Sequence, residues 1–205
     1  MAIGEFVGQA DAYGSGQEMR AKKLFIKHEH GAQPSRTDSI DFSPEGIAKN
    51  VACAPFRQIL LASESVTADC GVRDGDLLEN VVIDCDGLYD LPSGTVVQIG
   101  QALIRLTFHC EPCRKILKFV DHATILHRRG VFGSFLNSGR MSVGDGFTVT
   151  TQKFEPIPYE IGARIRWFLR RHGGSGAIVD LTHAIGLPAS YRKAMPSLLR
   201  KALAR

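Results

Sequence analysis

Residues 96–108 form a long apolar run whose side chains alternate. Two sets of side chains can be separated: Ala102, Ile104, Leu106 and Phe108 on one face, and Leu103, Arg105, Thr107 and His109 on the other. A period of two is typical of a half-buried β-strand. Shorter apolar or β-branched runs at 4–10, 24–27, 58–62, 77–83 and 147–151 also favour strands, whereas 31–38 favours a loop. The chain is therefore expected to be mainly β (α+β), a barrel or sandwich with a few short helices.

The pattern changes at Glu155-Pro156-Ile157-Pro158. Beyond these prolines, Ile161, Ile165, Phe168 and Leu169 recur at helical spacing, and a second short helix is expected after Asp180. Residues 190–204 are also helical in pattern, with Pro196 expected to bend or split them. Residues 156–205 hold nine lysines and arginines against two acidic residues. We predict a β domain over residues 1–155 and a small, basic helical extension over residues 156–205.

The alternating run leads into Cys110-Glu111-Pro112-Cys113-Arg114-Lys115. Proline suits the first position of a helix, so a short helix is expected over 113–120, with Cys113 in its first turn. A helix N-terminus and neighbouring cations both favour a thiolate. A thiolate at Cys113 can attack, carry sulfur or bind a soft metal. Cys110 is either a resolving thiol in a dithiol redox pair or a packing residue.

The cysteines do not indicate a disulfide framework, since there are five and their spacing is irregular. His109 with Cys110 and Cys113 lacks the second close pair that a zinc site usually has. The sequence shows neither a secretory signal nor an apolar stretch long enough to span a membrane. We therefore expect a cytoplasmic protein with reduced thiols that does not associate with membranes.

Four segments, in this order, resemble the MOSC domain, the C-terminal module of molybdenum cofactor sulfurases, which also occurs as free-standing bacterial proteins. They are Arg57-Gln58-Ile59-Leu60-Leu61, then Leu78-Glu79-Asn80-Val81, then the strand from Ile99-Gly100 to Cys113, and last Arg129-Gly130-Val131-Phe132 through Gly139 to Asp145. Cys113 stands at the position of the family's cysteine. The family's "GIEGD" is replaced here by Gly46-Ile47-Ala48-Lys49-Asn50, which lacks the acidic residue.

The resemblance implies a β-barrel that binds molybdenum cofactor (molybdopterin), with Cys113 as molybdenum ligand or as persulfide sulfur carrier. Some free-standing members reduce N-hydroxylated compounds, so the chain is either an oxidoreductase or a sulfur-transfer protein. Candidate partners are a cysteine desulfurase and a redox protein, and we expect a monomer or homodimer. A pyridoxal phosphate site is not expected, because in sulfurases it belongs to a separate domain. Candidate cofactor-binding residues, chosen for phosphate or pterin contacts, are Arg114, Arg129, Lys115, Asn80 and Arg57.

Residues 165–199 more distantly resemble a winged helix-turn-helix, similar to the DNA-binding half of alkyltransferase-like proteins. Their positive charge could supply phosphate contacts. In that alternative the chain is a nucleic-acid-associated protein, and Tyr191, Arg192 and Lys193 are the contact residues. The other interpretation is a helical appendage that packs on the barrel or forms a dimer contact.

Overall fold

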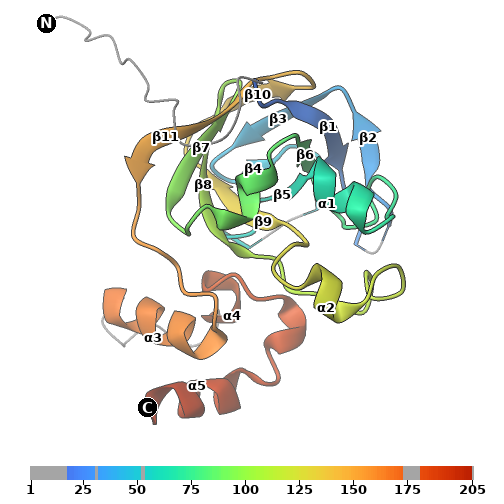
Figure 1. The fold of residues 1–205 in the computed structure, drawn as a ribbon. Helices are drawn as coiled ribbons and strands as arrows, with labels where there is room; N and C mark the ends of the chain where they lie inside the picture. Colours follow the sequence, from blue (N-terminus) through green and yellow to red (C-terminus); the bar gives the residue numbers. More distant parts are fainter. Residues whose placement is uncertain (1–17, 31, 52–53, 173–180, 205) are drawn as a thin grey trace, which may run out of the picture.

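The computed structural model describes residues 18–30, 32–51, 54–172 and 181–204. In this part of the chain, an eight-stranded sheet curls into a half-barrel, a three-stranded sheet lies beside it, and the C-terminal helices gather at one end (Figure 1). The strands are β1 (Ala21–Ile26), β2 (Ser35–Thr37), β3 (Ser39–Ser43), β4 (Gly46–Ile47), β5 (Ile59–Ser63), β6 (Val81–Ile83), β7 (Thr95–Ile99), β8 (Ala102–His109), β9 (Val131–Phe135), β10 (Gly139–Ser142) and β11 (Phe147–Lys153). The expected mainly β fold is confirmed.

Short helices connect or follow these strands. They are α1 (Glu64–Asp69), η1 (Asp86–Asp90), α2 (His122–Ile125), α3 (Ile161–Arg171), α4 (Leu181–Ala184), η3 (Ala189–Tyr191) and α5 (Met195–Leu203), where η marks a 3₁₀ helix. None of the described helices is long and apolar enough to cross a membrane.

The large sheet has the strand order β11-β7-β8-β9-β5-β6-β1-β2. Its neighbouring strands are antiparallel except β5 and β6, which are parallel. Backbone hydrogen bonds also join the start of β1 to the start of β11: Ala21 donates to the carbonyl of Asp145 at 2.9 Å, and Phe147 donates to the carbonyl of Met19 at 2.7 Å. These bonds bring distant parts of the sheet together and give it its barrel-like curl.

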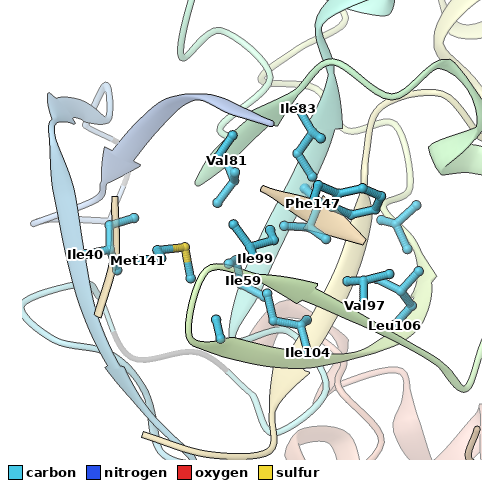
Figure 2. Close-up of a cluster of buried hydrophobic side chains, with 14 of the residues drawn as sticks. Ile40, Ile59, Val81, Ile83, Val97, Ile99, Ile104, Leu106, Met141 and Phe147 are labelled. Atoms are coloured by element: carbon cyan, nitrogen blue, oxygen red, sulfur yellow. The ribbon is translucent and has the colours of Figure 1, made fainter. Parts of the chain in front are cut away.

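The core fills the concave side of the sheet, as Figure 2 shows. Its buried side chains include Ile40, Ile59, Val81, Ile83, Val97, Ile99, Ile104, Leu106, Met141 and Phe147. Along β8, Ala102, Ile104 and Leu106 point into this core, as the alternation predicted. The pairing of β8 with β9 is irregular after Leu106, and Phe108 joins a second cluster on the side of the C-terminal helices.

Three of the expected elements are wrong in detail. The run 96–108 is two strands, because the chain turns back between Ile99 and Ala102. The segment 31–38 was expected to be a loop, yet residues 35–37 form the edge strand β2, whose pairing with β1 outweighs its polar sequence. The strand expected at 77–83 is only β6, since Leu77 and Leu78 lie in a turn. The strand expected at 4–10 lies outside the described residues.

The C-terminal helices follow the sequence pattern closely. Helix α3 carries the predicted apolar spacing, and Ile165 is buried in a cluster with residues of α4 and α5. Pro196 lies in the first turn of α5, so the expected split of the 190–204 run is confirmed. Asp180, the expected N-cap residue of the second helix, lies outside the described residues.

Candidate functional site

The segment that carries Cys113 leaves the end of β8 and continues as a series of turns. The amides of Ile116 and Leu117 both donate to the carbonyl of Cys113, at 3.0 and 3.1 Å. Residues 114–119 form turns and not a helix, so the helix expected over 113–120 is wrong. Ile116 and Val120 pack in a small apolar cluster with Val66 of α1 and Ile125 of α2. Asp121 then starts the separate helix α2 by accepting a hydrogen bond from the Thr124 amide. Without a helix, the argument from a helix dipole at Cys113 does not apply.

Cys113 itself is half-buried. Its side chain packs on a small apolar cluster that includes Val66, Leu77 and Ile116. The next two side chains, Arg114 and Lys115, are exposed. Cys113 is thus not enclosed, and two exposed cationic residues follow it in the sequence.

Cys110 lies in a different environment. Its side chain is 2% exposed and belongs to the second apolar cluster, with Leu60, Phe108, Phe132 and Trp167. Burial raises the pKa of the Cys110 thiol, although the nearby arginines Arg129 and Arg57 oppose this rise. A protonated, enclosed thiol is poorly suited to a dithiol redox pair, so the structure favours the packing role for Cys110.

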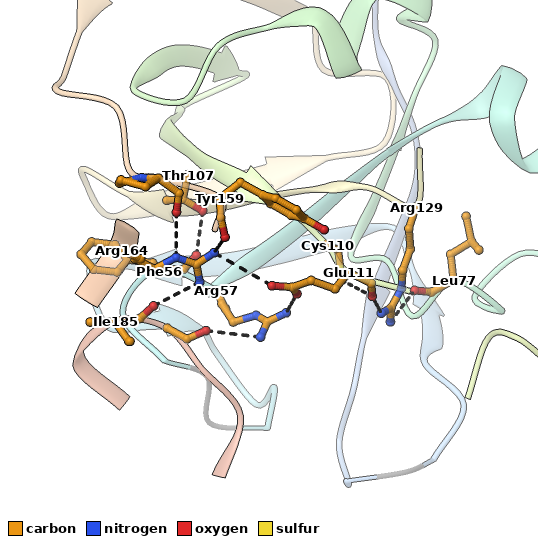
Figure 3. Close-up of polar contacts among 12 residues, drawn as sticks. Phe56, Arg57, Leu77, Thr107, Cys110, Glu111, Arg129, Tyr159, Arg164 and Ile185 are labelled. Carbon is orange, nitrogen blue, oxygen red and sulfur yellow. Dashed lines mark hydrogen bonds and ion pairs between the residues drawn. The ribbon is translucent and has the colours of Figure 1, made fainter. Parts of the chain in front are cut away.

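Glu111, between the two cysteines, is the centre of a network of arginines (Figure 3). Its side chain receives Arg57 Nη2 at 2.8 Å, and Arg164 Nη2 of α3 lies 4.0 Å from its other carboxylate oxygen. Its backbone carbonyl accepts a hydrogen bond from Arg129 Nη1 at 2.6 Å. The segment 110–113, called the cysteine segment below, is therefore held through both the side chain and the backbone carbonyl of Glu111.

Two of the predicted phosphate-binding arginines are used in this network. Arg57 also donates to the carbonyl of Gly186 at 3.3 Å and lies 4.1 Å from the centre of the Phe132 ring. Arg129 is 6% exposed and also donates to the carbonyl of Leu77 at 3.4 Å. Its Nε atom is buried and has no hydrogen-bond partner among the described residues. Arg57 and Arg129 thus hold the cysteine segment, while Arg114 and Lys115 remain exposed beside it.

Asn80 joins three strands from a buried position. Its side-chain oxygen accepts from the amide of Leu60 at 3.1 Å, and its side-chain nitrogen donates to the carbonyl of Phe25 at 3.1 Å. Both ends of the amide are therefore bonded inside the barrel, between β5 and β1. The structure places Asn80 as a residue that fixes the loop before β6.

Sequence reasoning missed a group of aromatic side chains beside the cysteine segment. The ring of His109, at the end of β8, lies 5.5 Å from His127, 6.4 Å from Tyr89 and 6.4 Å from Tyr159. Burial lowers the pKa of His109, and its Nδ1 atom has no hydrogen-bond partner among the described residues. These residues are far apart in the sequence, so their proximity could not be predicted. The alternation of β8 indicated only that His109 lies on the face opposite to the core residues.

Glu79, quoted above only as part of a motif, is fully buried. One of its carboxylate oxygens accepts from the Gly75 amide at 2.6 Å, and the other has no partner among the described residues. Burial raises the pKa of this carboxyl group. Within the described part of the chain, no three His, Cys, Asp or Glu side chains are grouped so as to hold a metal ion, and the zinc arrangement is therefore not formed there.

The residues predicted to contact nucleic acid lie near the start of α5. Arg192 and Lys193 are exposed, whereas Tyr191 is half-buried against the cluster of the C-terminal helices. Other cations of the extension have protein partners: Arg164 is fully buried, and Arg166 donates to the carbonyl of Ala202 at 3.2 Å. Part of the positive charge of the extension is thus paired within the molecule.

Part of the barrel matches a known protein family. Residues 59–148 match the MOSC domain. The MOSC match runs from β5 to the start of β11 and includes Cys113, Arg129 and the motif with Glu79 and Asn80. The resemblance drawn from the sequence is confirmed for this stretch. No curated protein sequence matches the chain at a significant level.

Solved structures share the fold of this chain at low sequence identity. The YUAD protein from Bacillus subtilis is 19% identical, with a TM-score of 0.56, over 68% of this chain and 98% of that one. YiiM from Escherichia coli is 15% identical, with a TM-score of 0.52, over 90% of this chain and 93% of that one. Residues 1–155 are only about three quarters of the chain. The similarity to YiiM therefore includes part of the helical extension.

Proposed function

We propose that this MOSC protein binds a molybdenum cofactor and uses Cys113 as its thiolate ligand or as a persulfide sulfur carrier. The observation that supports the proposal most directly is the contrast between the two thiols of one motif. Cys110 is enclosed, whereas Cys113 is half-buried within the stretch that matches the MOSC domain. The MOSC match by itself supports only the broader role in molybdenum cofactor or sulfur chemistry.

The residues present fit such a group. A thiolate is a soft ligand that suits a transition metal, and Arg114 and Lys115 offer exposed cations for a pterin phosphate. Arg129 keeps a buried Nε donor without a partner among the described residues, next to the cysteine segment. When bound, a molybdenum cofactor supplies two-electron redox chemistry and atom transfer.

In this proposal the chain's own residues do three things. Cys113 provides the sulfur, while Arg129 and Glu111 fix the backbone from which Cys113 projects. Arg114 and Lys115 attract and hold an anionic group. Asn80 and Arg57, which were predicted to touch the cofactor, support the strands and the segment around it.

As a carrier, Cys113 would react with a persulfide on a desulfurase. Its thiolate attacks the terminal sulfur, a new sulfur–sulfur bond forms on Cys113, and the desulfurase cysteine leaves as a thiolate. Reduction of an N-hydroxylated compound would instead break an N–O bond and release the oxygen as water, with two electrons from a redox partner and two protons. Both uses require the same reachable sulfur.

The test is the cofactor content of protein purified without oxygen from a host that makes molybdenum cofactor. We expect molybdenum and pterin in the wild-type protein and at least a tenfold loss in Cys113→Ser. Cys70→Ser is the matched control, because Cys70 is also half-buried and packs on the same cluster. Equal cofactor content in the two variants would refute the ligand role. Mass spectrometry after incubation with a desulfurase and cysteine would then show whether Cys113 gains one sulfur atom.

A further inference from the structure

We infer that Arg164, on the first helix of the C-terminal extension, is a positioning residue for the cysteine segment and acts through Glu111. Arg164 is outside the MOSC match at 59–148, and it is separated from Glu111 by more than fifty residues. The contact between the two is a feature of this chain's geometry. Its functional meaning rests on the role proposed above for Cys113.

The first step of the argument is the burial of Arg164. Its side chain is 0% exposed, which makes it one of the largest fully buried side chains among the described residues. Burial lowers the pKa of its guanidinium to about 10, so the group still carries its charge at neutral pH. Burying a charge costs free energy unless other groups compensate it, so the partners of Arg164 indicate its role.

Three of these partners belong to the extension or to the linker before it. Arg164 donates to the carbonyls of Pro158 at 2.9 Å, Tyr159 at 2.5 Å and Ile185 at 3.3 Å. These bonds explain how the guanidinium is held, and they keep α3 close to the linker and to α4. They do not neutralise its charge.

The remaining partners belong to the barrel. The guanidinium carbon lies 3.6 Å from the centre of the Phe108 ring at the end of β8, and Nη2 lies 4.0 Å from Glu111 Oε1. Glu111 is the carboxylate that favours the charged form of Arg164. Arg164 therefore ties the extension to the strand that leads into the cysteine segment and to the segment itself (Figure 3).

Glu111 cannot easily move while this contact is made. Arg57 holds its other carboxylate oxygen and also bonds the carbonyl of Gly186 in the extension, so the carboxylate is placed between two cations. Gly186 itself leaves little room, because a Cβ there would lie 3.1 Å from the Phe108 ring and 3.2 Å from the Cβ of Phe56. The extension thus sets the position of Glu111, and Glu111 sets that of the cysteines on either side of it.

The chain contains its own probes for this inference. Cys110 is enclosed directly before Glu111, in a cluster completed by Ile157 and Trp167 beyond the barrel. Cys85 is equally buried but lies in the main core of the barrel. Alkylation of Cys110 therefore reports release of the segment, whereas alkylation of Cys85 reports opening of the barrel.

The experiment compares Arg164→Met with Arg170→Met in the full chain, by mass spectrometry of peptides after timed exposure to iodoacetamide. Arg170 is on the same helix but is exposed, so it is the matched control. We expect Cys110 to react at least tenfold faster in Arg164→Met, with Cys85 within about twofold of wild type. Arg164→Lys, which keeps the charge, should restore most of the protection of Cys110.

Glu111→Gln provides a second test if Arg164→Met does not fold. It keeps the shape of the side chain, removes the charge, and should also speed the reaction of Cys110. If the contact between Arg164 and Glu111 is what protects Cys110, the double variant should react no faster than the faster single variant, because the contact that the two residues share is already lost in each single variant. Equal reaction of Cys110 in Arg164→Met and Arg170→Met, or a parallel rise at Cys85, would overturn the inference.

Cofactor content measured on the same preparations separates this inference from the proposed function. If the wild-type protein holds no molybdenum cofactor while Cys110 still responds to Arg164, the positioning stands and the proposed function fails. If the wild-type protein holds the cofactor while Cys110 is indifferent to Arg164, the proposed function stands and the positioning fails. If both hold, Arg164→Met should lose cofactor at least tenfold, and Arg170→Met should retain it.

Discussion

Arg129 donates a hydrogen bond to the backbone carbonyl of Glu111 at 2.6 Å, and its neighbour Arg128 instead pairs with Asp69 at 3.0 Å on the surface. We predict that Arg129→Met lowers the free energy of unfolding by about 2–4 kcal/mol, because it removes a buried charged donor from the carbonyls of Glu111 and Leu77. Arg128→Met should cost about 0–1 kcal/mol, since Arg128 and its partner Asp69 are both exposed. Urea denaturation measures both, and equal losses would contradict the prediction.

Asn80 gives a prediction that separates support from cofactor contact. Asn80→Ala removes the partners of the Leu60 amide and the Phe25 carbonyl, so we expect a loss of about 2–4 kcal/mol in the free energy of unfolding. The cofactor bound per folded molecule should stay close to that of wild type. A large fall in cofactor content with unchanged stability would instead restore the predicted cofactor-binding role.

The two glycines Gly133 and Gly162 should respond to alanine with opposite signs. In β9, a Cβ on Gly133 would overlap Ile104 and lie 3.1 Å from Ile59, so Gly133→Ala is expected to destabilise by about 1–3 kcal/mol. In α3, a Cβ on Gly162 would meet only Arg166, at 3.7 Å, so Gly162→Ala should stabilise by about 0.5–1 kcal/mol. Thermal or urea unfolding checks both signs.

Glu79 predicts a dependence of stability on pH. Burial raises its pKa in the folded protein, so as pH rises above the ordinary value of 4.5 the unfolded chain loses this proton first. The free energy of unfolding therefore falls progressively from about pH 4.5 up to the raised pKa of Glu79, and above that pH this contribution is constant. Because Glu79→Gln cannot titrate, its melting temperature relative to wild type should increase between pH 4.5 and pH 7.5. A difference that does not change with pH would show that the carboxyl group titrates alike in both states.

The sequence predicted the features that depend on local pattern. The alternation in β8 places Ala102, Ile104 and Leu106 in the core, and the spacing of Ile161 and Ile165 gives α3. It predicted one strand over 96–108, because the apolar run continues on both sides of the turn after Ile99. It also predicted a helix at 113–120, where the structure has turns instead. Tertiary contacts decided these cases, as they commonly do for short segments.

In the candidate site too, local sequence predicted some features, whereas others depend on tertiary contacts. Cys113 was predicted as a site residue from residue type and from the family resemblance, and it is half-buried in the structure. The surroundings of Glu111 could not be predicted, since Arg57, Arg129 and Arg164 reach it from three separate parts of the chain. Each of these arginines has an ordinary sequence context, and only the folded chain shows that two of them carry buried charge.

The hydrogen bonds between the start of β1 and the start of β11 have a consequence for how the molecule forms. β1 also pairs with β6, so the first described strand depends on residues near 82 and near 146. During synthesis it must wait until most of the barrel has left the ribosome. Contacts so distant along the chain are associated with slow folding, in the range of about milliseconds to seconds. The nascent chain would therefore stay exposed to chaperones until its last strand is made.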